Sequence, residues 1–83
     1  MADSLYAIER YDAAGAEVVL RPLAGAARLV AAVRLAADDV LLALVAGPDP
    51  ETVTAAAVTA GWRVDRITPA TWIHPPATLE ALP

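Results

Sequence analysis

One segment of the chain, residues 40–46, VLLALVA, carries no polar side chain at all. A run of this length between turn residues is typical of a strand, and it is too short to span a membrane. Antiparallel strands with one wet face alternate apolar and polar residues, and this segment does not. It therefore predicts a strand that is covered on both faces. In a chain of 83 residues helices can cover one face, and we expect a second subunit to cover the other.

Alternation predicts a strand on either side of this segment in the sequence. Residues 5–11, LYAIERY, place on one face Leu5, Ala7, Glu9 and Tyr11. Residues 66–73, RITPATWI, predict a last strand. Pro69 donates no hydrogen bond to a neighbouring strand, so this strand is expected at an edge of the sheet.

The clearest helix is predicted over residues 50–60. Asp49 is a favoured N-cap, Pro50 suits the first helical position, and Gly61 is the residue expected just past the end. The buried stripe of this helix consists of small residues at helical spacing, Val53, Ala56, Ala57 and Ala60. Such residues let a helix lie close to a sheet.

Residues 12–37 allow two interpretations. In the first, a helix lies between about residues 13 and 25, although Pro22 and Gly25 weaken its end, and 27–35 form a strand. Residues 36–39 then make a hairpin loop, and Arg28 and Arg34 share one strand face. In the second, a hairpin spans 6–21 and a helix spans 23–36. We favour the first.

The composition indicates that the protein has a second apolar surface to bury. Hydrophobic residues make up 58% of the chain, against about 45–50% in an average domain. An oligomer hides such an excess, and a homodimer is the commonest case. The net charge of −4 argues against nucleic-acid binding. Charged residues interrupt the apolar segments, so none reaches the roughly 18 residues that a membrane-spanning helix needs. The N-terminus lacks the pattern of a signal peptide and the chain has no cysteine, so we expect a soluble, cytoplasmic protein.

Several short motifs resemble a family of small bacterial ferredoxin-like proteins, described as a domain of unknown function with one nickel-binding branch. The motifs are Ile8-Glu9-Arg10, Val45-Ala46-Gly47-Pro48, Gly61-Trp62 and Asp65-Arg66-Ile67. The resemblance covers residues 5–74. It implies an α+β fold, a ferredoxin-like β-α-β-β-α-β two-layer sandwich that pairs through its sheet as a dimeric α+β barrel. It also favours the hairpin interpretation of 27–46. Residues 1–74 would form the single domain, and 75–83 a proline-rich tail.

The chain departs from this family at two positions. Ala46 stands where an acidic residue is common, and His74 is the only histidine. A nickel site needs a cluster of imidazole or carboxylate ligands. We therefore expect no metal site, and we expect no cofactor.

A few polar and aromatic residues are candidates for chemistry. Glu9 and His74 are the catalytic candidates, because a carboxylate inside a barrel or an imidazole can act as a base. The candidates for ligand binding are Tyr11, Arg34 and Trp72. Each also has an ordinary interpretation. Glu9 pairs with Arg10, Arg34 or Arg66 or is simply solvated. His74 is exposed, and the aromatic residues pack in a core or an interface.

Three functions remain open from the sequence. The first is a homodimeric module that binds a small ligand or another protein. The second is a small cofactor-free enzyme of the isomerase, cyclase or monooxygenase type, with its site inside the barrel. The third is nickel binding. The sequence does not decide whether the protein is an enzyme.

Overall fold

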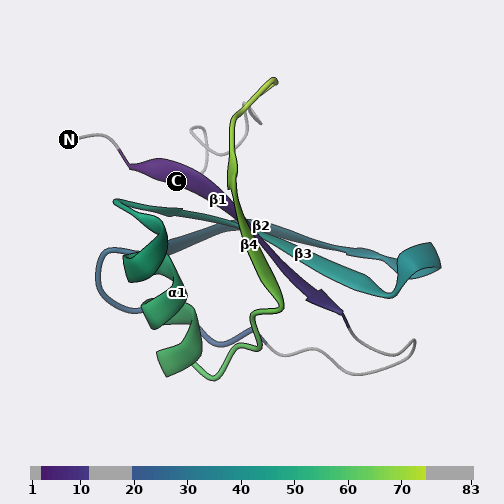
Figure 1. The fold of residues 1–83 in the computed structure, drawn as a ribbon, viewed down its shortest axis with the longest axis horizontal. Helices are drawn as coiled ribbons and strands as arrows, with labels where there is room; N and C mark the ends of the chain where they lie inside the picture. Colours follow the sequence, from purple (N-terminus) through teal and green to yellow (C-terminus); the bar gives the residue numbers. More distant parts are fainter. Residues whose placement is uncertain (1–2, 12–19, 75–83) are drawn as a thin grey trace, which may run out of the picture.

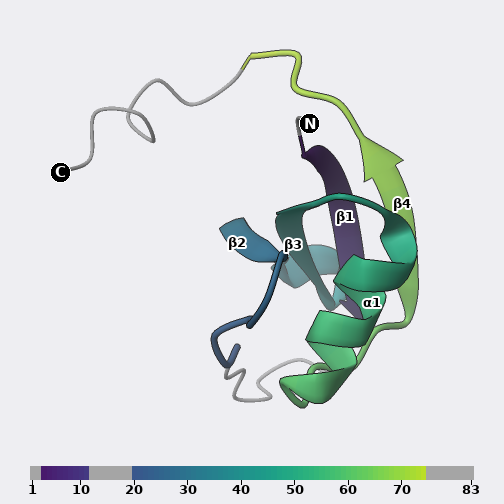
Figure 2. The same ribbon diagram turned by 90° about the vertical axis from the view of Figure 1, so that its left-hand side faces the viewer.

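The computed structural model describes residues 3–11 and 20–74. Within these residues, four strands form one antiparallel sheet and one α-helix packs on one of its faces (Figures 1 and 2). In chain order the elements are β1 (Ser4–Tyr11), β2 (Arg28–Leu35), the short 3-10 helix η1 (Ala36–Asp38), β3 (Val40–Gly47), α1 (Pro50–Thr59) and β4 (Arg66–Ala70). The strand order across the sheet is β2-β3-β1-β4. The fold is a small α+β fold.

Alternation along β1 and β3 sorts their side chains between the two faces of the sheet. In the register of these strands, Tyr6 lies opposite Val45 and Ile8 opposite Ala43, and all four side chains are buried beneath α1. The other face, which we call the open face, presents the alternate residues of these two strands, including Ala7, Glu9, Leu42 and Leu44. The predicted strand is confirmed as β3 and α1 covers one of its faces, whereas cover of the open face by a second subunit stays a prediction.

The helix α1 begins and ends where the sequence predicts. The Asp49 carboxylate accepts a hydrogen bond of 2.7 Å from the Thr52 backbone N–H, and Pro50 is the first helical residue. At the other end Gly61 has φ +84°, which a residue with a Cβ adopts only with strain. The backbone N–H groups of Gly61 and Trp62 donate to Val58 and Ala57, so a Schellman motif closes the helix.

Directly after the Schellman motif of α1 the chain enters the hydrophobic core. Trp62 is buried, and its indole Nε1–H donates to the Arg21 backbone carbonyl over 2.8 Å. The expected helical stripe is confirmed as well, because Val53 and Ala57 are fully buried and Ala56 and Ala60 pack against the core.

The helix expected between about residues 13 and 25 falls only in part on the described residues. Residues 12–19 lie outside the described part of the chain, and residues 20–27 contain no helix. Pro22 disfavours helical geometry in the residue before it, and Gly25 adopts φ +73° in a turn. Leu20 and Leu23 nevertheless pack against the core. The β-α-β-β-α-β expectation is therefore met in its four strands and its second helix.

The hairpin interpretation of residues 27–46 is confirmed, and the competing helix over 23–36 is wrong. Residues 36–39 form the loop between β2 and β3, with Asp39 in the left-handed region at φ 52°. The expected shared face of Arg28 and Arg34 is wrong, because the β2–β3 register shifts between Leu29 and Ala31. Arg28 pairs with Ala46 on the open face, and Arg34 pairs with Leu41 on the helix face.

The last strand is an edge strand, as Pro69 predicts, but it is shorter than expected. It ends at Ala70, opposite Leu5, so that only Ser4 of β1 extends past the end of β4. Residues 71–74 continue beyond the sheet in Figure 1. The expected tail, residues 75–83, lies outside the described part of the chain.

Candidate functional site

Five polar and aromatic residues gather at the end of β1, where β4 begins. We call this group the β1–β4 polar cluster. It consists of Glu9, Tyr11, Arg63, Asp65 and Arg66. The antiparallel register brings it together, since Glu9 pairs directly with Arg66 and the chain arrives at Arg66 from α1 through Arg63 and Asp65.

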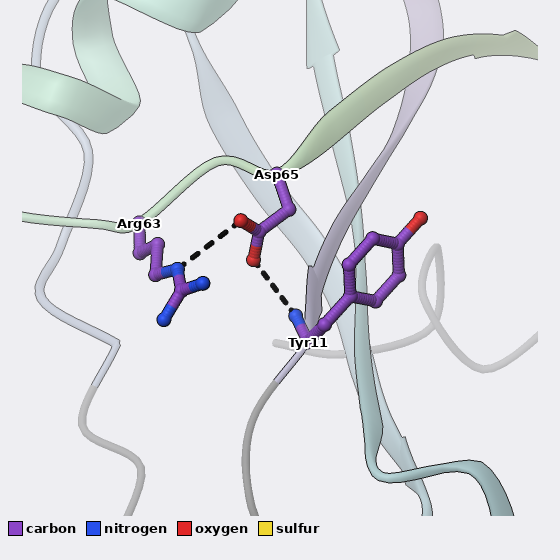
Figure 3. Close-up of polar contacts among 3 residues, drawn as sticks. All are labelled: Tyr11, Arg63 and Asp65. Carbon is purple, nitrogen blue, oxygen red and sulfur yellow. Dashed lines mark hydrogen bonds and ion pairs between the residues drawn. The ribbon is translucent and has the colours of Figure 1, made fainter.

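Asp65 holds the two strands together at this point (Figure 3). Its Oδ2 accepts a hydrogen bond of 2.8 Å from the Tyr11 backbone N–H, and its Oδ1 accepts one of 3.1 Å from Arg63 Nε. Its own backbone N–H donates to the Glu9 carbonyl over 3.0 Å. The hydrogen bond from Tyr11 N–H, with a smaller contribution from Arg63, holds the pKa of the Asp65 carboxyl below its ordinary value. Asp65 is thus a structural anchor that is ionised at neutral pH.

Glu9 lies on the open face and is the most enclosed charged side chain of the cluster on that face. Its Oε1 accepts a hydrogen bond of 3.1 Å from the Tyr11 hydroxyl, and its Oε2 lies 3.7 Å from Arg66 Nε. The Glu9 side chain is 24% exposed, whereas that of Arg66 is 62% exposed. The ordinary interpretation of Glu9, an ion pair with Arg66, is confirmed. The same geometry leaves a carboxylate and a phenol side by side on an apolar sheet, an arrangement that can bind a polar group or move a proton.

The remaining candidates from the sequence lie elsewhere. Arg34 sits on the helix face, opposite Leu41, so it does not share the face of Glu9. Trp72 and His74 follow Ala70, which pairs with Leu5 at the far end of β1 from Tyr11. At about 3.3 Å per residue, the six residues from Leu5 to Tyr11 separate Tyr11 by roughly 20 Å from the end of β4 at Ala70, and Trp72 follows that end. Tyr11 and Trp72 therefore do not line one pocket.

The sequence did not indicate that Asp65 and Arg63 belong to the cluster. Asp65 stood only in a family motif, and its partner, the Tyr11 N–H, is 54 residues away in the sequence. An acidic residue directly before an edge strand is a weak signal for such an anchor, because it can accept from the free backbone N–H groups of the neighbouring strand.

A shallow groove runs between α1 and the crossover before β2. It is open to solvent and is lined mainly by small residues, Pro22, Ala24, Gly25, Ala26, Thr52, Ala55, Ala56, Thr59 and Ala60. Its lining carries hydroxyls from Thr52 and Thr59 and no charged side chain. The groove could accommodate a ligand but has few polar groups to orient one, so the β1–β4 polar cluster is the better candidate site.

The described residues contain neither a candidate metal site nor a candidate membrane-spanning helix. No group of three or more His, Asp or Glu side chains there is close enough to hold a metal ion. Within residues 3–11 and 20–74 no helix has both the length and the apolar character that crossing a bilayer requires.

Comparisons of the chain with protein-family models, with curated proteins and with solved structures gave no match in any of the three.

Proposed function

We propose that this protein is a ferredoxin-like homodimeric binding module that pairs through the open face of its sheet. The observation that carries the proposal is the contrast between the two faces. On β1 and β3 one face is buried beneath α1, whereas the open face presents half-buried Leu42 and Leu44 and, on β2, exposed Val33 and Leu35. Val33 is 52% exposed and Leu35 45% exposed. Apolar side chains that are contiguous across two strands gain free energy when a partner covers them.

The strand connections support the ferredoxin-like part of the proposal. The crossover from β1 to β2 passes β3, and the crossover from β3 to β4 passes β1. The ferredoxin-like pattern repeats such a split crossover twice, and the second crossover here contains the helix that the pattern places there, α1. In such a fold one sheet face is left without helices and is available to a second copy.

The β1–β4 polar cluster gives this dimer a place to hold a small ligand. Glu9, Tyr11 and Arg66 lie at one end of the open face, beside the apolar residues of β3. Facing sheets would exclude water from this end. An acceptor, a phenol and a guanidinium in an apolar setting fix the orientation of a small polar molecule.

A second candidate function, a small cofactor-free enzyme, rests on the Tyr11–Glu9 hydrogen bond. The phenol donates to the carboxylate and so holds it in one orientation, as a general base requires. Under this alternative, Glu9→Gln would abolish turnover while the dimer stays intact. Under the binding-module proposal, Glu9→Gln would weaken ligand binding and no turnover would be observed for wild type.

Size-exclusion chromatography with light scattering tests the pairing. Wild type is expected to be a dimer at micromolar concentration. Leu44→Glu, which places a charge in the middle of the open face, is expected to give a monomer. The matched control is Val58→Glu, which places the same charge on the exposed side of α1 and should leave the dimer intact. Circular dichroism checks that both variants fold. A wild type that stays monomeric would refute the proposal.

A further inference from the structure

Strand β2 is exposed on its outer edge and on both of its faces. It pairs only with β3, so within the described residues its outer row of backbone N–H and C=O groups faces no strand. The helix α1 packs against β3 and β4, away from β2 (Figure 2). Consistent with this, Ala32 on the helix face is exposed, and so are Leu29, Val33 and Leu35.

The two edges of the sheet differ in how well they are protected. The edge strand β4 is five residues long, contains Pro69 and begins with Arg66. Proline and charged residues are the usual devices that keep an edge from pairing with another chain. β2 is eight residues long, has no proline and carries exposed apolar side chains. Its protective features are Arg28, Arg34 and the register shift between Leu29 and Ala31, and of the two arginines only Arg34 lies beyond that shift.

Beyond that shift, β2 has one regular stretch. Ala31–Leu35 pair consecutively with Leu44–Val40 of β3, and the centre of the stretch is Val33. We propose that Ala31–Leu35 is a strand-addition site for the same segment of a second copy, paired antiparallel about a two-fold axis at Val33. The four-stranded sheets of the two copies would then join into one continuous sheet.

The sequence of this stretch suits pairing with itself. A two-fold axis at Val33 places Val33 opposite its own copy, Ala31 opposite Leu35, and Ala32 opposite Arg34. No arginine faces an arginine, and each large side chain other than Val33 faces an alanine. This register also keeps the open faces of both copies on the same side, so that Ala31, Val33 and Leu35 of both copies form one apolar stripe.

This edge pairing does not depend on the face pairing proposed above, because it uses backbone groups at the rim of the sheet. Five paired residues bury much less than the roughly 1,200 Å² of a stable interface, so the association should be weak. We expect it at concentrations of about 0.1–1 mM, the range of weak complexes.

Hydrogen–deuterium exchange of wild type, measured by NMR across a dilution series, tests the proposal. Outward-facing amides of Ala31–Leu35 should exchange about tenfold more slowly once nine-tenths of the chains are paired. The amides of β4 should show no such dependence on concentration. Face pairing creates no new backbone hydrogen bonds, so it does not produce this pattern. Exchange rates of Ala31–Leu35 that are the same at all concentrations would overturn the proposal.

Three variants sharpen the test. Val33→Lys brings two ammonium groups together at the two-fold axis and should abolish the concentration-dependent protection, whereas Val58→Lys, at a similarly exposed valine on α1, should preserve it. Leu44→Glu should also preserve it, even where that variant removes the face pairing. Equal behaviour of Val33→Lys and Val58→Lys would contradict the proposal, and so would protection that depends on Leu44.

Discussion

The indole N–H of Trp62 donates to the backbone carbonyl of Arg21 over 2.8 Å, across 41 residues of sequence. This bond ties the end of α1 to the crossover before β2, a segment without regular secondary structure in residues 20–27. Because the crossover has no helix of its own here, its position depends on Trp62 and on the packing of Leu20 and Leu23.

Trp62→Phe should lower the free energy of unfolding by about 1–3 kcal/mol, from a lost hydrogen bond and from the volume left empty. Trp72→Phe is the matched control, because Trp72 is much more exposed and lies outside the sheet. It should change stability by less than about 0.5 kcal/mol. Urea denaturation measures both. Equal effects of the two substitutions would show that the Trp62–Arg21 bond does not hold the crossover.

Gly47, at the end of β3, leaves room for Val53 of α1. A Cβ at position 47 would overlap the Val53 Cγ2, and a valine in a helix has little rotamer freedom with which to move away. Gly47→Ala should therefore cost about 1–3 kcal/mol of stability. In a Val53→Ala background the clash is gone, so the double variant should lose less than the sum of the single changes.

Gly61→Ala provides the contrast. A Cβ there meets nothing within 4 Å, and its cost, about 1–2 kcal/mol, comes from the left-handed backbone. Its effect should add to that of Val53→Ala within about 0.5 kcal/mol. Additivity of Gly47→Ala with Val53→Ala would mean that the two residues do not set the spacing of α1 on the sheet.

Local signals in the sequence were sufficient for the strands and for α1. The Asp49 cap, the Gly61 stop and the apolar run of β3 each depend on residues within a few positions of one another. The shift between Leu29 and Ala31 was not predictable, because residues 29–33 are all apolar and mark neither face, and an extra residue in one strand shows only against its partner. The role of Asp65 could not be read either, since its bond to Tyr11 depends on the sheet topology. The candidate site was thus foreseen in Glu9 and Tyr11 but not in the residues that hold them.

Asp65 and Asp49 should make stability fall at acid pH. Hydrogen bonds from Tyr11 N–H to Asp65 and from Thr52 N–H to Asp49 lower both pKa values from 3.8. A carboxyl with a lowered pKa in the folded state stabilises the fold above its unfolded pKa, and this contribution is lost as pH falls through the folded pKa. Unfolding midpoints should therefore decline below about pH 4.

Asp65→Asn separates the contribution of Asp65. The amide oxygen of asparagine can still accept from Tyr11 N–H, but it carries no charge and does not titrate. The difference in stability between wild type and Asp65→Asn should be largest above about pH 4 and should shrink toward pH 2. Urea denaturation from pH 2 to 7 provides the comparison. A difference that is constant over this range would show that the Asp65 charge does not contribute.

Thr68 carries a buried hydroxyl on β4. Its Oγ1 is inaccessible to solvent and has no hydrogen-bond partner in the described part of the chain. Thr68→Val keeps the shape and the strand preference and removes the unsatisfied oxygen, so it should raise the free energy of unfolding by about 1–2 kcal/mol. Thr71→Val, at an exposed position beyond the sheet, should change it by less than about 0.5 kcal/mol. A loss of stability in Thr68→Val would reveal a partner for the hydroxyl.

Replacing Glu9 tests whether this residue stabilises the fold or serves a function. Its partners Tyr11 and Arg66 are both well exposed, so water can replace its hydrogen bonds to them. An exposed ion pair contributes only about 0–1 kcal/mol, whereas leucine at this position would extend the apolar contacts with Leu42 on β3. Glu9→Leu should therefore raise stability by about 0.5–1.5 kcal/mol.

A residue whose replacement raises the stability of the fold is expected at a site where binding or catalysis requires that residue. Arg66→Ala is the control for the lost ion pair, and it should alter stability by less than about 1 kcal/mol in either direction. Thermal and urea unfolding of the three proteins would settle the comparison. If Glu9→Leu is less stable than wild type by more than Arg66→Ala, then Glu9 supports the sheet itself. In that case the functional site has to be sought away from the β1–β4 polar cluster.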